Sequence, residues 1–126
     1  MTVRFVQLFS VPVTDQARAR DFYVDVLGLE LVREQPMGPG RHWVQLRPRS
    51  AETAITLVTW FDEMPAGSLR GLVLETDDLD GDAARLAERG VDVGPVEQMP
   101  WGRYVQFPDP DGNRLILQAT DADGGR

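Results

Sequence analysis

With 126 residues, of which 42% are hydrophobic, the chain is long enough to form one globular domain with its own core. It contains no cysteine and no lysine, so disulfides, thiolate metal sites, cysteine nucleophiles and Schiff-base chemistry are excluded. A net charge of −7 disfavours binding to nucleic acid or anionic membranes. The negative charge suits a cationic ligand, but many acidic domains carry such a charge simply because it keeps them soluble.

The N-terminal sequence predicts a cytoplasmic protein. Residues 1–13 contain one arginine and no long apolar run, which is neither the pattern of a signal peptide nor that of a membrane span. We therefore expect no membrane partner.

The first half of the chain begins with a predicted strand and helix. β-branched and aromatic residues predict a strand over Phe5–Val13. Thr14 or Asp15 is expected to cap a helix that ends at Gly28, a residue suited to the left-handed conformation at helix ends. The predicted buried stripe of this helix consists of Ala17, Phe22, Val26 and Leu27, with Ala19 and Tyr23 at its flanks.

Three further strands complete this half. They are predicted over Leu29–Arg33, His42–Arg47 and Ala54–Trp60, and the stretch Gln35–Gly40 is expected to be a loop because it is rich in proline and glycine. The pattern is interrupted again at residues 62–68, which we predict to be a linker.

The same order of elements then begins again. A strand is predicted over Leu69–Thr76, followed by a helix that Asp77 or Asp78 caps and Gly90 ends. A weak strand near residues 96–99 leads into the last segment.

The strongest local signal is the hairpin near the C-terminus, where the turn sequence Asp109–Asn113 joins two alternating runs. Proline presets its own φ and Gly112 can adopt the positive φ of a tight reversal. The period of two then separates an apolar face (Val105, Phe107, Leu115 and Leu117) from a mostly polar one (Tyr104, Gln106, Arg114, Ile116 and Gln118). We expect the polar face to line the site.

The repetition predicts an α+β fold of two βαβββ modules that form curved mixed sheets around a concave cleft. Gly28, after the first predicted helix, and Gly90, after the second, are 62 residues apart in the sequence. The segments expected to cap the two helices are separated by the same number of residues, to within one. The predicted modules are 1–61 and 69–120, joined by the linker 62–68 and followed by a flexible tail, 121–126; together they form one domain. Because one module cannot cover its own sheet, we expect two modules to pair, within one chain or between two chains.

These landmarks resemble the vicinal oxygen chelate superfamily, which includes glyoxalase I, extradiol dioxygenases, fosfomycin resistance enzymes and bleomycin resistance proteins. The similarity lies in Val13-x-Asp15, in Arg18-Ala19-x-x-Phe22-Tyr23 with Leu27-Gly28, and in Pro100–Arg103 with Asp109–Asn113. The resemblance implies paired βαβββ modules. It does not fix the activity, because members with different functions share these turn, cap and core residues.

In the metal-dependent members the resemblance implies four ligands on the concave face, which correspond here to Leu8, Thr56, Gly71 and Ile116. None of these residues carries an imidazole or a carboxylate, and one hydroxyl cannot hold a divalent cation. The sole histidine, His42, lies on another strand. We therefore predict no metal site and no cofactor.

Strand parity predicts a polar lining with aromatic edges for the cleft. Its candidate ligand-binding residues are Ser10, Thr56, Trp60, Glu75, Trp101, Tyr104, Gln106, Arg114 and Gln118. Each unpaired polar group in a cleft costs about 1–3 kcal/mol, so water or a ligand is expected to fill it. The alternatives are that Glu75 pairs with Arg114, that the face is solvated, and that Trp101 only packs structurally. Arg103 is expected to pair with Asp109 or Asp111.

Several functions remain open at this point. The first is a metal-independent, homodimeric protein that binds a small organic molecule, cationic or aromatic, and sequesters a drug or natural product as bleomycin resistance proteins do. The second is a glyoxalase-like lyase or isomerase, or a dioxygenase-related enzyme, with a displaced or absent metal. In that enzyme Glu75 would act as base, and Tyr104 or Arg114 would stabilise an oxyanion. A third is an interaction module without a small ligand.

Overall fold

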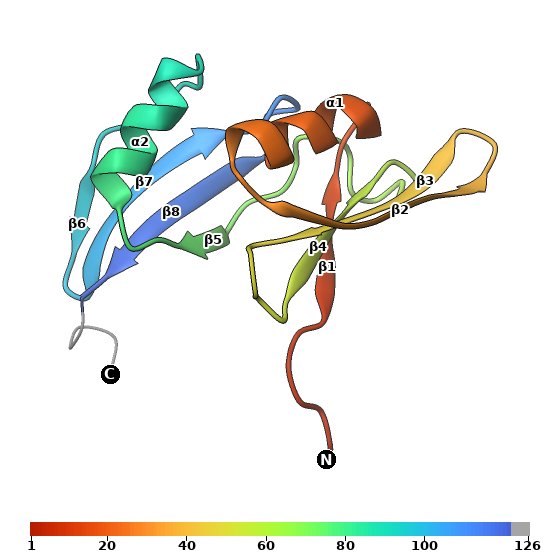
Figure 1. The fold of residues 1–126 in the computed structure, drawn as a ribbon, viewed down its shortest axis with the longest axis horizontal. Helices are drawn as coiled ribbons and strands as arrows, with labels where there is room; N and C mark the ends of the chain where they lie inside the picture. Colours follow the sequence, from red (N-terminus) through yellow and green to blue (C-terminus); the bar gives the residue numbers. More distant parts are fainter. Residues whose placement is uncertain (122–126) are drawn as a thin grey trace.

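The computed structural model describes residues 1–121 and contains two modules of the order β-α-β-β-β, which confirms the predicted α+β fold (Figure 1). Of the predicted tail, 121–126, all but Asp121 lies outside the described residues. Among residues 1–121, no helix has both the length and the apolar character needed to cross a membrane.

The first module contains a four-stranded mixed sheet, which we call sheet one. Its elements are β1 (Leu8–Pro12), helix α1 (Gln16–Asp21) with the π-helical segment η1 (Phe22–Val26), β2 (Glu30–Gly38), β3 (Arg41–Arg47) and β4 (Ala54–Val58). The strand order is β1-β4-β3-β2; β1 runs parallel to β4, and the other pairs are antiparallel.

The second module repeats this topology in sheet two. Its elements are β5 (Leu72–Glu75), α2 (Leu79–Glu88), β6 (Glu97–Met99), β7 (Gly102–Pro108) and β8 (Arg114–Thr120). The strand order is β5-β8-β7-β6, with β5 parallel to β8. The internal repeat inferred from the sequence is therefore a repeat of topology.

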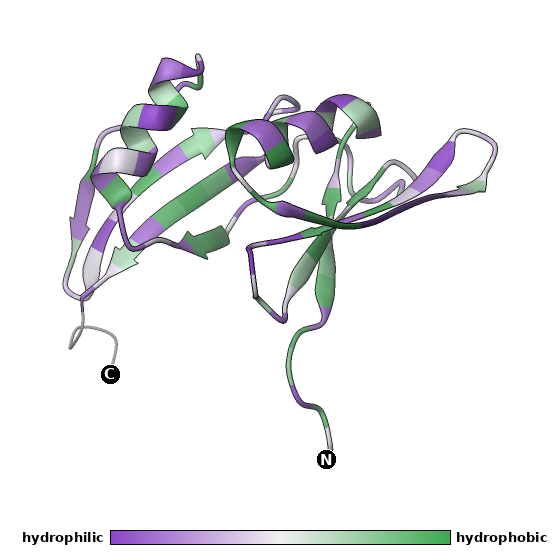
Figure 2. Cartoon of the chain, viewed as in Figure 1, coloured by the Kyte–Doolittle hydropathy of each residue, from purple (hydrophilic) through white to green (hydrophobic). Residues whose placement is uncertain are grey.

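Both helices lie on the same side of the molecule, against one side of the sheets (Figure 1). Apolar side chains of the two sheets and both helices form one continuous core, in which Val11 and Leu57 of sheet one join Val105 and Phe107 of sheet two. Green apolar and purple polar residues alternate along several strands in Figure 2, as a sheet with one buried side requires. We call the side of each sheet opposite its helix the far face.

The predicted caps are present. The carboxylate of Asp15 accepts a hydrogen bond from the Arg18 backbone N–H at 3.1 Å, and that of Asp78 accepts one from Gly81 N–H at 3.1 Å. Gly28 and Gly90 have φ of 82° and 84°, as expected for residues that end helices.

Several predicted boundaries were wrong. β1 begins at Leu8 rather than Phe5, β4 ends at Val58, and β5 is confined to residues 72–75. The stretch Gln35–Gly40 is not a loop, because β2 continues to Gly38 and pairs with β3. Pro36 is tolerated there because β2 is an edge strand, where a missing N–H costs no ladder hydrogen bond.

The buried stripe of the first helix was also assigned to the wrong residues. Gln16, Ala19 and Tyr23 are its buried residues, whereas Ala17 is exposed. A glutamine can be buried here because its side-chain amide donates to the backbone carbonyls of His42 and Leu57 at 2.7 and 2.8 Å. Which side of the helix is buried depends on these tertiary contacts, and the spacing of apolar residues in the sequence does not reveal them.

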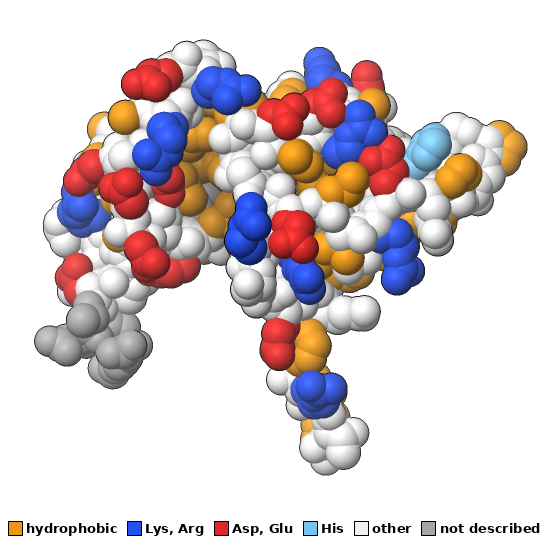
Figure 3. Space-filling model, in the orientation of Figure 1, with side chains coloured by type: hydrophobic (Ala, Val, Ile, Leu, Met, Phe, Trp, Pro, Cys, Tyr) orange, Lys and Arg blue, Asp and Glu red, His pale blue; other side chains and the backbone are white. Residues whose placement is uncertain are grey.

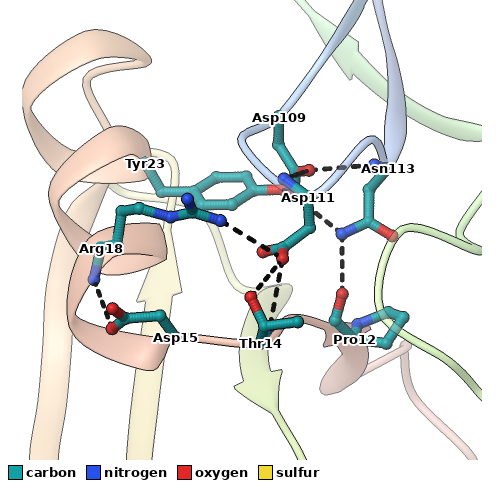
Figure 4. A network of polar contacts seen from close by, with 8 residues as sticks. All are labelled: Pro12, Thr14, Asp15, Arg18, Tyr23, Asp109, Asp111 and Asn113. Carbon is teal, nitrogen blue, oxygen red and sulfur yellow. Dashed lines mark hydrogen bonds and ion pairs between the residues drawn. The ribbon is translucent and has the colours of Figure 1, made fainter.

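The hairpin turn Asp109–Asn113 joins the two modules through a network of hydrogen bonds (Figure 4). Asn113, which is completely buried, donates from Nδ2 to the Pro12 carbonyl and to Asp109 Oδ2, each at 2.8 Å. Tyr23 donates its hydroxyl to the same Asp109 oxygen at 2.8 Å. Because Pro12 and Tyr23 belong to the first module, this network fixes the far faces relative to one another.

Candidate functional site

The far face of sheet two carries the polar residues predicted from the hairpin. Val105, Phe107 and Leu115 are completely buried on the helix side. The alternate residues of β7 and β8 therefore lie on the far face, which they share with Val73 and Glu75 of β5 through the register of the sheet.

One row of polar side chains crosses all four strands of sheet two. The strand register aligns Glu75 with Gln118, Gln118 with Tyr104, and Tyr104 with Glu97. A second row contains Val73, Ile116 and Gln106. The four predicted residues Glu75, Tyr104, Gln106 and Gln118 therefore come together on one surface.

Glu75 is held by Thr120 and does not pair with Arg114. The Thr120 backbone N–H donates to one Glu75 carboxylate oxygen at 2.8 Å, and its hydroxyl donates to the other at 2.7 Å. Gln118 in turn donates to the Thr120 hydroxyl at 2.9 Å. These two hydrogen bonds fix the orientation of the Glu75 carboxylate against β8.

Arg114 has no hydrogen-bond or ion-pair partner for its side chain among residues 1–121. It is half-buried, and its backbone N–H donates to the Leu69 carbonyl at 3.0 Å. Its guanidinium is therefore available to a ligand. The sequence-based partners of Arg103 were also wrong, because Arg103 pairs with Asp80 of α2 at 3.2 Å.

The far face of sheet one carries an equivalent polar row. The register aligns Ser10 with Thr56, Thr56 with Gln45, and Gln45 with Arg33, so the row crosses β1, β4, β3 and β2. Thr56 is 1% exposed, and its hydroxyl has no hydrogen-bond partner within the described residues. The predicted residues Ser10 and Thr56 are adjacent, as expected.

Sequence reasoning missed most of what β3 contributes. Trp43, Gln45 and Arg47 alternate with the buried residues Val44 and Leu46, so they lie on the far face. The Trp43 indole N–H donates to the Gln45 side-chain oxygen at 3.0 Å. The signal for these residues in the sequence is their alternation with the apolar Val44 and Leu46.

The two predicted aromatic edges have different positions. Trp60 follows β4, and the guanidinium of Arg41 lies 5.5 Å from its ring centroid, which fixes the ring as part of a cation–π pair. Trp101 lies in the turn between β6 and β7, 43% exposed, beyond the last aligned pair of Met99 and Gly102. It therefore stands apart from the polar row of sheet two.

The positions that correspond to metal ligands lie on the far faces. Thr56 aligns with Ser10, and Ile116 aligns with Val73 and Gln106, while Leu8 and Gly71 offer no polar side-chain atom. Over residues 1–121, no three histidine, cysteine, aspartate or glutamate side chains converge in a way that could hold an ion. This donor set does not fit a divalent cation, so we derive no step through a metal.

Comparison with known proteins identifies the family of the chain. Residues 5–117 match the profile of the Glyoxalase/Bleomycin resistance protein/Dioxygenase superfamily. The chain belongs to this superfamily. The uncharacterized protein YetH of Bacillus subtilis (strain 168) is 33% identical over 120 residues, covering 92% of this chain and 98% of YetH.

Two solved structures are more similar in sequence to this chain. TnmS3, an antibiotic binding protein from Streptomyces sp. CB03234, is 52% identical with a TM-score of 0.92, covering 96% of this chain and 99% of TnmS3. A superfamily member from Sphaerobacter thermophilus DSM 20745 is 35% identical with a TM-score of 0.86, covering 94% of this chain and 99% of the other. These similarities extend over both modules.

Proposed function

We propose that this chain is a metal-independent binding protein that holds a small antibiotic or a similar natural product on the far faces of its sheets. The observation that carries the proposal is the 52% identity to the antibiotic binding protein TnmS3 along 96% of the chain. The lack of chelating side chains at the four family positions is consistent with binding that needs no metal.

The arrangement of the far faces supports a binding role. Polar rows on both sheets offer amides, hydroxyls and guanidinium groups, and Trp43, Trp60 and Tyr104 add flat apolar area. Such mixtures orient aromatic natural products through a few hydrogen bonds. The net charge of −7 favours a cationic ligand, and the presence of these aromatic side chains favours an aromatic ligand.

Glu75, the base in the enzyme alternative, is held in place within sheet two. As a base in a lyase or isomerase it would have to accept a proton from a bound substrate. Because Thr120 donates once to each of its carboxylate oxygens, the side chain is held in one orientation and keeps a second lone pair on each oxygen. Recovery of a bound compound with unchanged mass, rather than this geometry, is what distinguishes binding from catalysis.

Titration of the protein with bleomycin and a panel of antibiotics of varied charge and aromatic content tests this function. We expect at least one compound to change the tryptophan fluorescence, to give saturable heat in calorimetry, and to be recovered with unchanged mass. A panel without any binding would overturn the proposal, and a chemically altered compound would favour the enzyme.

A pair of glutamine variants tests the location of the site. Gln106 lies on the far face of β7, whereas Gln98 aligns with Arg103 on the helix side of the same sheet. We expect Gln106→Ala to weaken binding several-fold and Gln98→Ala to leave it unchanged. Equal effects of the two substitutions would move the site away from the far face.

We also propose that the protein acts as a homodimer. Residues 1–5 extend away from the body of the molecule (Figure 3), and Val3 in this segment and Val6 next to it are 79% and 62% exposed. Val73 on β5, at one edge of sheet two, is 48% exposed as well. Association of two copies would cover these residues. Light scattering with size-exclusion chromatography should give twice the mass of 14.1 kDa, and a monomer at micromolar concentration would contradict the dimer.

A further inference from the structure

The far faces differ in charge from the rest of the molecule. Within residues 1–121 they carry four arginines, Arg33, Arg41, Arg47 and Arg114, but three acidic residues, Glu30, Glu75 and Glu97. The other acidic residues within residues 1–121 lie elsewhere, many of them in the left lobe in Figure 3, which contains α2. A strongly acidic chain therefore has a far-face surface with more cations than anions.

Two of these three carboxylates are already engaged. Glu30 pairs with Arg47 at 3.4 Å, and both oxygens of Glu75 accept hydrogen bonds from Thr120. Among the described residues, the side chains of Arg33 and Arg114 have no carboxylate partner. Of the far-face carboxylates only Glu97 is left to attract a cation.

Two donors on the far face of sheet one are buried without a partner. They are the hydroxyl of Thr56 and the Nε–H of Arg47, which lie on neighbouring strands β4 and β3. Leaving a buried donor unpaired costs about 1–3 kcal/mol. Because an arginine N–H can only donate, the partner that would remove this cost is an oxygen acceptor.

We propose that the far faces select a neutral or anionic ligand whose carbonyl, hydroxyl or carboxylate oxygens accept hydrogen bonds from Arg114, Arg47 and Thr56, and that they discriminate against cations. This inference rests on the proposed function and specifies its ligand class. It replaces the cationic ligand suggested by net charge, because local charge acts on a bound molecule more strongly than the distant, screened charge of the helices.

Two xanthene dyes of similar shape and opposite charge test the inference. Fluorescein presents carboxylate and phenolate oxygens, whereas rhodamine 123 presents amino groups and carries a positive charge. Fluorescence anisotropy at an ionic strength of about 0.15 M, where the distant charge of the helices is screened, should show fluorescein binding at least about tenfold more tightly. Tighter or equal binding of rhodamine 123, or binding of neither dye, would overturn the inference.

Matched variants identify the residues responsible. Arg114→Gln removes a far-face charge, and Arg89→Gln removes an exposed charge at the end of α2. We expect the first to weaken fluorescein binding about five- to tenfold and the second to leave it within about twofold. Thr56→Val keeps the side-chain shape but removes the unpaired hydroxyl, so it should weaken binding without loss of stability.

Failure of this inference can be told apart from failure of the proposed function. If the antibiotic panel yields a bound cation, the binding function stands and the ligand class proposed here is wrong. Equal effects of Arg114→Gln and Arg89→Gln would likewise overturn the role of the far-face charges. If the panel yields no ligand at all, the proposed function itself fails.

Discussion

The hydroxyl of Tyr23 makes one of the buried contacts between the modules. The side chain is completely buried, and its only described hydrogen bond runs to Asp109 Oδ2. Burial, followed by the negative charge of Asp109, raises the pKa of Tyr23 far above its usual value near 10. Both causes oppose the formation of a phenolate in the folded protein.

This shift predicts a loss of stability at alkaline pH. Between the unfolded pKa near 10 and the higher folded pKa, the unfolded chain releases a proton that the folded chain keeps. The free energy of unfolding should therefore be insensitive to Tyr23 below about pH 9 and fall above about pH 10, by up to about 1.4 kcal/mol per pH unit. Denaturant titrations at several pH values measure this slope.

The composition of the chain makes this measurement unusually clean. There are no lysine or cysteine side chains and two tyrosines, so few other groups titrate in this range. In a Tyr104→Phe variant, phenolate absorbance at 295 nm should appear only together with unfolding. Tyr23→Phe should remove the alkaline slope; a slope that persists in this variant would assign it to another group.

At the scale of elements, the β7–β8 hairpin depends on the conformation of its turn. Gly112 has φ of 92°, and a Cβ at this position would meet no atom within 4 Å. The cost of Gly112→Ala is therefore conformational, and we expect a loss of about 1–2 kcal/mol in the free energy of unfolding.

Gly94 provides the control for this substitution. It lies outside the positive φ range, and a Cβ there would be 3.4 Å from the Gln106 carbonyl oxygen, close to ordinary contact. Gly94→Ala should change stability by less than about 0.5 kcal/mol. Equal losses in the two variants, measured by urea unfolding, would show that the turn conformation does not limit stability.

The hairpin could be predicted from the sequence because all of its determinants are local. Its turn residues and alternation lie within one segment, so the buried and polar faces of β7 and β8 were assigned correctly. The extent of β2 and the buried side of α1 depend on partners far along the chain, Arg41–Arg47 and the module network, and local patterns predicted them wrongly. In β2 and α1, contacts with residues far along the chain outweigh the local secondary-structure propensity.

The candidate site was predictable to a similar extent. Thr56 and Ser10 were placed together from parity and the family positions, but Gln45 and Arg33 join their row only through the register of β3 with β4 and β2. That register includes a bulge in β2, which no alternation pattern predicts. The hydrogen bonds of Glu75 to Thr120 depend on the pairing of β5 with β8 in the same way.

At the scale of the whole molecule, we expect the two modules to unfold together as one domain. Their apolar residues form one core, and the Asn113 network connects the Pro12 carbonyl of the first module with the β7–β8 turn of the second. In a Trp101→Phe variant, fluorescence reports only Trp43 and Trp60 of the first module, whereas circular dichroism reports both modules. Coincident urea transitions would support one domain, and separated transitions would contradict it.

Asn113→Ala tests how much the module network contributes to this cooperativity. The substitution leaves the buried Pro12 carbonyl without its 2.8 Å donor and the Leu69 N–H without its 3.0 Å acceptor. We expect a loss of about 2–4 kcal/mol in the free energy of unfolding, with the two probes still coincident because the shared core remains. Gln98→Ala, which removes hydrogen bonds within a single hairpin, should cost less than about 1 kcal/mol. If Asn113→Ala cost no more than this control, the angle between the modules would have to be fixed by the apolar core alone.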